Sequence, residues 1–161
     1  MKHLLAIGAF VASVSTASAA DWVLGVGTSQ FHDNNADNGA LVSAEVHSNP
    51  FFTGNRFSAS FMGVVDAHTS GDVFVGAGLS GLWDFNSQWF VEGSVAPGYF
   101  NASSPGNDLG SPFGIRLLLG VGYRLNTGDS LSLAVTHKSN ASTASRNPGV
   151  NAIHLRYRHS F

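Results

Sequence analysis

The chain has 161 residues, of which 43% are hydrophobic and 11% are charged, with a formal net charge of −2 and no cysteine. This length allows one domain. A soluble domain usually carries about a quarter charged residues, so this chain has too few charges for a typical water-facing surface. The lack of a basic run argues against nucleic-acid binding, the 12 Phe, 3 Trp and 3 Tyr argue against disorder, and the absence of cysteine excludes disulfides and thiolate metal sites.

The first twenty residues have the pattern of a secretory signal peptide. Lys2 precedes an apolar stretch at residues 4–12, and small residues follow as far as Ala20. The apolar stretch is too short to span a bilayer, and a buried N-terminal helix is the alternative. We expect cleavage after Ala19 or Ala20, which makes residues 1–20 the signal peptide and residues 21–161 the folded domain.

From residue 21 onward, apolar and polar residues alternate in segments of roughly ten residues separated by Gly, Asn, Asp, Ser and Pro. No segment approaches the ~20 apolar residues of a membrane helix. Alternation with a period of two predicts antiparallel strands. We predict eight strands, at residues 22–28, 40–48, 56–68, 73–85, 89–100, 112–125, 130–140 and 151–161.

The two faces of these predicted strands differ in polarity. One face is continuously apolar, as in Phe57, Phe61 and Val65. The other face collects charges, namely Glu45, Asp66, Asp84, Glu92, Arg116, Arg124, Arg156 and Arg158. A secreted sandwich, the alternative, would bury the apolar face, whereas a transmembrane barrel turns it toward lipid. Most strands approach the 9–11 residues, roughly, of a tilted spanning strand, so we predict an all-β, eight-stranded antiparallel transmembrane β-barrel whose lumen is filled by side chains.

The lengths of the links give the barrel a direction. Short links follow the second, fourth and sixth strands and longer polar links follow the first, fifth and seventh, with a further tight link at Ser70 and Gly71. Short turns of outer-membrane barrels face the periplasm and long loops face outside. The aromatic Phe161 at the end of an alternating strand resembles the C-terminal signature of such barrels. We therefore expect a bacterial outer-membrane protein.

The penultimate predicted strand carries a polar pair on its apolar face. By alternation, His137 and Ser139 project from the same side as Leu131, Leu133 and Val135, near the outer end of the strand. Polar groups there are costly to desolvate unless they are bonded. A serine beside a histidine base is the minimum arrangement for activating a hydroxyl as a nucleophile. Loop-edge residues in headgroup water are the alternative.

Further stretches of the C-terminal half extend this pattern. They are His137-Lys138-Ser139-Asn140-Ala141, Asn147-Pro148-Gly149-Val150-Asn151, Leu155-Arg156-Tyr157 and Phe90-Val91-Glu92-Gly93, together with Phe113, Arg116 and Gly120. On these residues the chain resembles the PagL family of lipid A 3-O-deacylases, eight-stranded outer-membrane barrels with His-x-Ser-Asn on the penultimate strand. The His-Ser-Asn motif is the specific part of the resemblance.

The resemblance implies roles for the residues of the motif. His137 would be the general base, Ser139 the nucleophile that attacks an acyl ester, and Asn140 the oxyanion donor. The reaction would release the fatty acid ester-linked at position 3 of lipid A, with no cofactor and no metal. The implied partners are lipid A or lipopolysaccharide and the outer membrane, without nucleic acid, and a homodimer is left open.

One position departs from the family pattern. Members place on the last strand an acid that orients the histidine, and here Asn151 takes this position, opposite His137 in an antiparallel pair. An asparagine can hold an imidazole tautomer, but it cannot compensate the charge of an imidazolium. An ordinary polar residue at a strand start is the alternative for Asn151. Asp108 is a second candidate for the acid, whereas Asp129 lies at the wrong end.

The remaining polar residues receive structural interpretations. His32, His47, His68, His154 and His159 lack the paired spacing of a metal site and are interpreted as lumen, loop or girdle residues. The segment at residues 33–39 is rich in oxygen ligands but lacks the distal glutamate of a calcium loop, which favours a flexible extracellular loop. Glu92 is expected to pair with lumen arginines. A non-enzymatic outer-membrane barrel with adhesive or binding loops is the alternative function.

Overall fold

The computed structural model describes residues 19–161, and the elements in this range are β-strands. They are β1 (Ala19–Phe31), β2 (Gly39–Ser48), β3 (Phe52–Thr53), β4 (Phe57–His68), β5 (Val73–Asp84), β6 (Trp89–Asn101), β7 (Phe113–Arg124), β8 (Ser130–Ser139) and β9 (Val150–Ser160). The predicted signal peptide lies, except for its last two residues, outside this range and stays a prediction. Within residues 19–161 no helix has the length and apolar character needed to cross a membrane.

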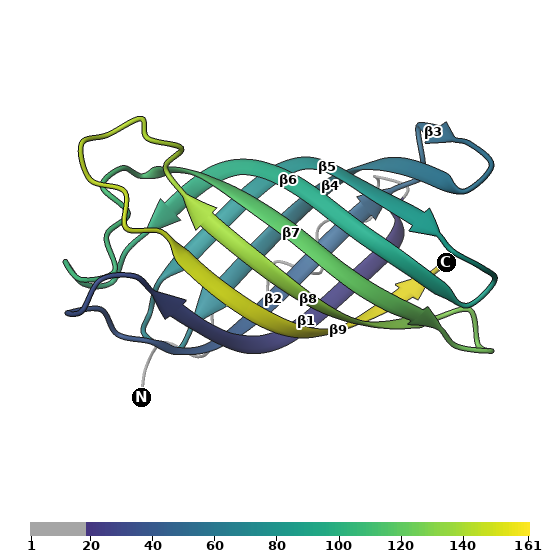
Figure 1. Ribbon diagram of the computed structural model, residues 1–161, viewed down its shortest axis with the longest axis horizontal. Coiled ribbons are helices and arrows are strands. Elements are labelled where there is room, and N and C mark those ends of the chain that lie inside the picture. The colour runs from purple at the N-terminus through teal and green to yellow at the C-terminus, as the bar shows by residue number, and fades with distance from the viewer. Residues whose placement is uncertain (1–18) are drawn as a thin grey trace.

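Eight of the strands close into one barrel, as Figure 1 shows. Each pairs antiparallel with its neighbours in the order β2-β1-β9-β8-β7-β6-β5-β4, and pairing of β2 with β4 completes the ring. The predicted all-β, eight-stranded antiparallel barrel is confirmed. The short strand β3, which pairs with Ala59 and Ser58 of β4, was not predicted, because it lies inside a link that was expected to be a simple turn.

The first strand extends further than its sequence pattern indicates. The prediction ended it at residue 28, whereas β1 continues to Phe31. In the added segment Gln30 pairs with Asn151 and Phe31 pairs with Val150 of β9. Because this ladder joins the first and last strands of the barrel, its length is set by a partner more than 100 residues away rather than by local alternation.

The links between strands lie at two ends of the barrel (Figure 1). We call the end with residues 49–56, 85–88 and 125–129 the turn end. The other end, called the loop end, carries residues 32–38, 69–72, 102–112 and 140–149. The strands β1, β4, β6 and β8 run toward the loop end, so the outer end of β8 lies beside the longest links.

The outer wall of the barrel is apolar, as alternation predicted. Leu119, Leu133 and Leu155 are each more than half exposed, whereas their neighbours along the strands face inward. Aromatic side chains gather on the outer wall near the turn end: Phe51, Phe52, Phe57, Phe61, Trp83, Phe85, Trp89 and Tyr123. This distribution is typical of a barrel whose wall contacts hydrocarbon.

The lumen near its middle is filled by paired charges. Arg116 bonds Asp66 at 3.0 Å and Glu45 at 2.9 Å, and Arg156 bonds Glu45 at 2.6 Å and also Glu92. Arg158 adds contacts with Glu92 and Asp21. Of the eight charges predicted to face inward, Asp84 and Arg124 differ from the rest, because they pair with one another in a half-exposed position close to the turns.

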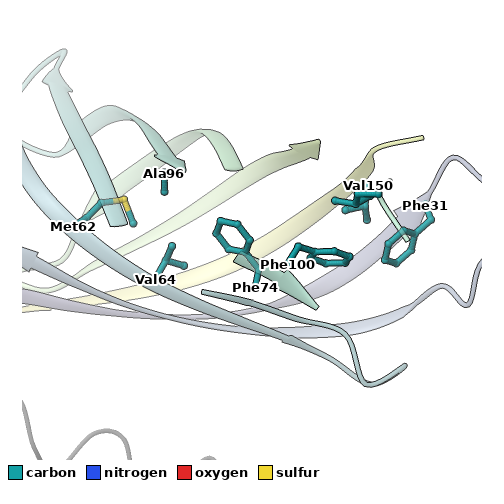
Figure 2. Close-up of a cluster of buried hydrophobic side chains, with 8 residues drawn as sticks. Phe31, Met62, Val64, Phe74, Ala96, Phe100 and Val150 are labelled. Atoms are coloured by element: carbon teal, nitrogen blue, oxygen red, sulfur yellow. The ribbon is translucent and has the colours of Figure 1, made fainter. Parts of the chain in front are cut away.

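An apolar cluster occupies the lumen toward the loop end. Figure 2 shows its side chains converging from several strands. The cluster comprises Phe31, Met62, Val64, Phe74, Ala96, Phe100, Leu109 and Val150. Since Leu109 belongs to the link at residues 102–112, this link folds over the barrel mouth and is fixed there by burial.

Candidate active site

The two residues of the predicted nucleophile–base pair lie on the outer wall of β8. His137 pairs with Leu117 and Ser139 pairs with Ile115 of β7, and both side chains are half-buried. Lys138, between them, points into the lumen, where its Nζ donates to Asp66 at 2.8 Å and to His68 at 3.1 Å. A shift of β8 by one residue would carry this cation to the lipid face, so the buried contacts of Lys138 fix His137 and Ser139 outward.

A hydrogen bond joins His137 to the last strand. His137 pairs with Asn151 in the β8–β9 ladder, which confirms the predicted register. The Nδ1 atom of His137 lies 2.8 Å from Asn151 Oδ1. Since an amide oxygen can only accept, His137 donates this hydrogen bond through Nδ1 and its Nε2 is left with a lone pair.

A third residue of this group was missed by the sequence analysis. Asn151 Nδ2 lies 2.9 Å from His32 Nε2, and His32 Nδ1 lies 3.0 Å from the carbonyl oxygen of Pro148. The backbone N–H of His32 also donates to the carbonyl of Gly149 at 3.2 Å. The signal that could have located His32 is the outward parity of β1, continued past Gln30 and paired with β9.

Ser139 is separate from this hydrogen-bonded group. Within the described part of the chain, its Oγ makes no hydrogen bond to another protein group, and none joins it to His137. Catalytic hydrogen bonds often form only in the substrate complex. The Ser139 hydroxyl is therefore not held by another described protein group.

Asn140 follows the pair but faces the loops rather than the outer wall. It is fully buried, and its Nδ2 donates to the carbonyls of Leu109 at 2.7 Å and Arg146 at 2.6 Å. Its Oδ1 accepts from the N–H of Ser142 at 2.9 Å. Both donors of the amide are thus in use, and they hold a link in which Ala141 and Ser142 have positive φ angles of 54° and 62°.

Gly149 lies against the imidazole of His137. Its φ is +71°, and a Cβ built on it would lie 3.0 Å from His137 Cε1 and 3.7 Å from Nε2. A side chain here would be strained in its backbone and would also crowd the edge of the ring. The glycine therefore lets the link at residues 140–149 pass close to the His137 ring.

The other candidates for the orienting acid lie elsewhere. Asp108 accepts a hydrogen bond from the N–H of Gly110, within its own link. Asp129 contacts His159 near the turns. Asp33, in the oxygen-rich segment, pairs with Arg146. Among the described residues, no group of three or more His, Asp or Glu side chains is arranged to hold a metal ion.

Ser–His contacts also occur inside the lumen, but their chemistry differs. Ser29 Oγ and His68 Nδ1 lie 3.0 Å apart, and both residues are buried. Because Lys138 donates to Nε2 of His68, Nδ1 must carry the proton and donate it to Ser29. Such a ring cannot deprotonate the serine, and no ester in a membrane can reach it.

A shallow hollow of about 770 Å³ crosses the outer wall beside His137. Its floor is apolar, with Leu117, Leu119, Val135 and Ile153 among its lining residues, and His137 and Asn151 lie along it. An extended alkyl chain could lie in such a hollow with its polar end next to His137.

A closed antiparallel barrel with an apolar outer wall and charges paired inside defines the class of the protein, a bacterial outer-membrane β-barrel. A sequence model of one family, described as lipid A 3-O-deacylase (PagL), matches residues 39–160. The protein belongs to this PagL family, whose activity is the hydrolysis of an acyl ester of lipid A. A search of curated protein sequences found no match.

Solved structures agree on the fold. The crystal structure of the outer-membrane enzyme PagL is similar with a TM-score of 0.73 and 18% identity over 88% of this chain and 100% of the other. Neisserial surface protein A is similar with a TM-score of 0.59 and 12% identity over 89% and 98% of the two chains. A designed transmembrane β-barrel gives 0.52 and 13% identity over 88% and 97%.

Proposed function

We propose that the protein is a lipid A 3-O-deacylase, which hydrolyses the ester-linked acyl chain at position 3 of lipid A with Ser139 as nucleophile and His137 as base. The observation that carries this proposal is the hydrogen bond between His137 Nδ1 and Asn151 Oδ1, on the same outer wall as Ser139. It leaves Nε2 as the basic atom, in a barrel of the deacylase family.

The reaction proceeds in two acyl-transfer steps. Ser139 Oγ attacks the ester carbonyl carbon while His137 Nε2 takes the hydroxyl proton, and a tetrahedral oxyanion forms. Collapse of this intermediate breaks the bond to the sugar oxygen, which receives the proton from the imidazolium. Water, deprotonated by His137, then attacks the acyl-serine. The bond between the acyl carbon and Ser139 Oγ breaks, the imidazolium returns its proton to Oγ, and a free fatty acid leaves. No cofactor takes part in these steps.

The oxyanion needs a donor, and the family pattern assigns this role to Asn140. As described above, both N–H groups of the Asn140 amide already donate to the carbonyls of Leu109 and Arg146. In the proposed reaction, Asn140 stabilises the oxyanion only after one of these two hydrogen bonds opens. Its present contacts support a second contribution, the ordering of the link that follows Ser139.

The outer-wall position suits a substrate that stays in the membrane. The ester of an outer-leaflet lipid lies at about the depth of the strand ends, and its acyl chain fits the apolar hollow along Leu117, Val135 and Ile153. Lipid A therefore reaches the site laterally. The lumen, filled by charged and apolar side chains, takes no part in binding.

The first test replaces the two reacting groups. Ser139→Ala and His137→Ala should each abolish deacylation, because each removes a group that takes part in bond making, and mass spectrometry of lipid A from cells expressing each variant measures this. Ser87→Ala is the matched control, since Ser87 is exposed in the link at residues 85–88 at the turn end, and this variant should keep the wild-type lipid profile. Heat-modifiable migration in gels checks folding. Wild-type lipid profiles in both alanine variants would instead support a non-enzymatic barrel with binding loops.

A further inference from the structure

His32 lies just beyond the outer end of β1, outside the segment that matches the family. Gln30, two residues before His32, pairs with Asn151, so His32 is placed diagonally across from Asn151 on the same outer face. Three contacts then run in series: His137 to Asn151 at 2.8 Å, Asn151 to His32 at 2.9 Å, and His32 to the Pro148 carbonyl at 3.0 Å.

The carbonyl of Pro148, at the end of this series, determines which atoms of His32, Asn151 and His137 donate and which accept. The Pro148 carbonyl only accepts, so Nδ1 of His32 carries the proton, and Nε2 of the neutral ring can only accept. The amide atom of Asn151 that faces Nε2 must then be the donor, Nδ2. Its oxygen consequently faces His137 and holds the proton on Nδ1 of that ring.

An asparagine at position 151 needs a neighbour that fixes the orientation of its amide, whereas an acid does not. Both oxygens of a carboxylate accept, so either orientation of a glutamate holds His137 in the same tautomer. An amide turned by 180° presents Nδ2 to His137, stabilises the tautomer with the proton on Nε2, and blocks the base. The departure of this chain from the family acid therefore creates a requirement for a residue that orients the amide.

We propose that His32 is a positioning residue that fixes the amide orientation of Asn151 and thereby keeps His137 Nε2 free to act as the base. This inference rests on the proposed deacylase function. His32 does not touch the reacting atoms; it acts through Asn151, and it supplies to an amide the orientation that a carboxylate at position 151 would not need.

The test compares two substitutions of His32 in two backgrounds. His32→Phe keeps a ring of similar shape but removes the acceptor, whereas His32→Gln keeps an acceptor within reach of Asn151. Each is made in the wild type and in Asn151→Glu, and deacylation of lipopolysaccharide in vesicles is measured for all of them. Folding is checked by heat-modifiable migration.

We expect His32→Phe to lower kcat about twofold in the wild type, because the loss of a hydrogen bond of about 1 kcal/mol lets the two amide orientations reach comparable populations. His32→Gln should restore most of the activity. In the Asn151→Glu background, which should match or exceed the wild type, His32→Phe should have little effect. A loss of equal size in both backgrounds would mean that His32 only supports the link through Pro148 and Gly149, and would overturn the proposal.

A spectroscopic readout separates this inference from the function on which it rests. Nitrogen-15 NMR shifts of labelled histidine report which ring nitrogen of His137 is protonated, and the His137→Ala variant identifies its signals. The wild type should show the proton on Nδ1, and His32→Phe a mixture of the two tautomers. An inactive wild type would end the deacylase proposal, whereas a wild-type tautomer in His32→Phe would overturn the inference alone.

Discussion

Gly149 shows how a single residue sets the space around the His137 ring. It combines a φ of +71° with a gap of only 3.0 Å between a built Cβ and His137 Cε1. Gly128 also has a positive φ, of +92°, but nothing lies within 4 Å of its built Cβ. Substitution of Gly128 therefore tests backbone strain alone, whereas substitution of Gly149 tests strain together with contact with the imidazole.

Gly149→Ala should lower deacylation at least about tenfold, because the methyl group displaces His137 in addition to the strain of roughly 1–2 kcal/mol that a left-handed backbone imposes on alanine. Gly128→Ala, the matched control, should impose the same strain and leave activity near the wild-type level. Vesicle assays of both variants measure this. Equal activities would show that the imidazole has room for the methyl group.

The sequence predicted only part of the hydrogen-bonded group of His137, Asn151 and His32. The reason is that its members lie on strands that are paired in different ways. The pairing of His137 with Asn151 follows from a hairpin, in which paired positions have a constant sum. His32 belongs to a pairing of the first and last strands, which no local pattern determines. The engaged amide of Asn140 also escaped prediction, because its partners come from two separate links.

Among the elements, the links at the loop end are organised by the carboxylate of Asp72. It accepts hydrogen bonds from Ser70 Oγ at 2.6 Å, from the N–H and Oγ of Ser103, both at 2.7 Å, and from Asn107 Nδ2 at 2.5 Å. These contacts tie the link at residues 69–72 to the link at residues 102–112. Burial alone would raise the pKa of Asp72, but the hydrogen bonds outweigh it and hold the pKa below its usual value of 3.8.

A carboxylate with a lowered pKa stabilises the fold above its usual pKa, and this stability is lost as the pH falls through the lowered value. The two links should therefore stay closed from neutral pH down to the usual value of 3.8 and open only as the pH falls below the lowered pKa of Asp72. Pepsin, which is active in acid, should cleave within residues 102–112 only below that value. Asp72→Asn should remove this pH dependence, and cleavage of both proteins with the same pH profile would contradict the role of Asp72.

The sequence predicted which segments form the barrel strands, but it did not predict where all of these strands end. The alternation of apolar and polar residues is imposed along every strand by lipid outside and packed side chains inside, so it is visible locally. The ends depend on other contacts. β1 is prolonged by its ladder with β9, and β3 forms because Phe52 and Thr53 find partners in β4.

For the barrel taken together, the central lumen depends on charges that compensate one another. Glu45 receives hydrogen bonds from Arg116 at 2.9 Å, Arg156 at 2.6 Å and His47 at 2.9 Å, with almost no exposure. Asp84 also bonds an arginine, Arg124, but 41% of its side chain is exposed. The same kind of ion pair thus occurs in a buried and in a solvated setting.

Glu45→Gln should destabilise the barrel by about 3–5 kcal/mol, because it leaves buried arginines without full compensation. Asp84→Asn, the solvated control, should cost at most about 1 kcal/mol. Urea unfolding of each variant in lipid vesicles measures both values. A similar small loss for the two would mean that water enters the lumen and screens its charges.

His137 and Ser139 project from the outer wall toward the membrane, and under the proposed function this position has a kinetic consequence. Ester and fatty acid both remain in one leaflet, and enzyme and target meet by diffusion in two dimensions. Turnover then follows the fraction of neighbouring lipids that carry the scissile chain, whatever the volume of the surrounding medium. As the reaction proceeds, each catalyst exhausts its own patch of membrane and accumulates its products there.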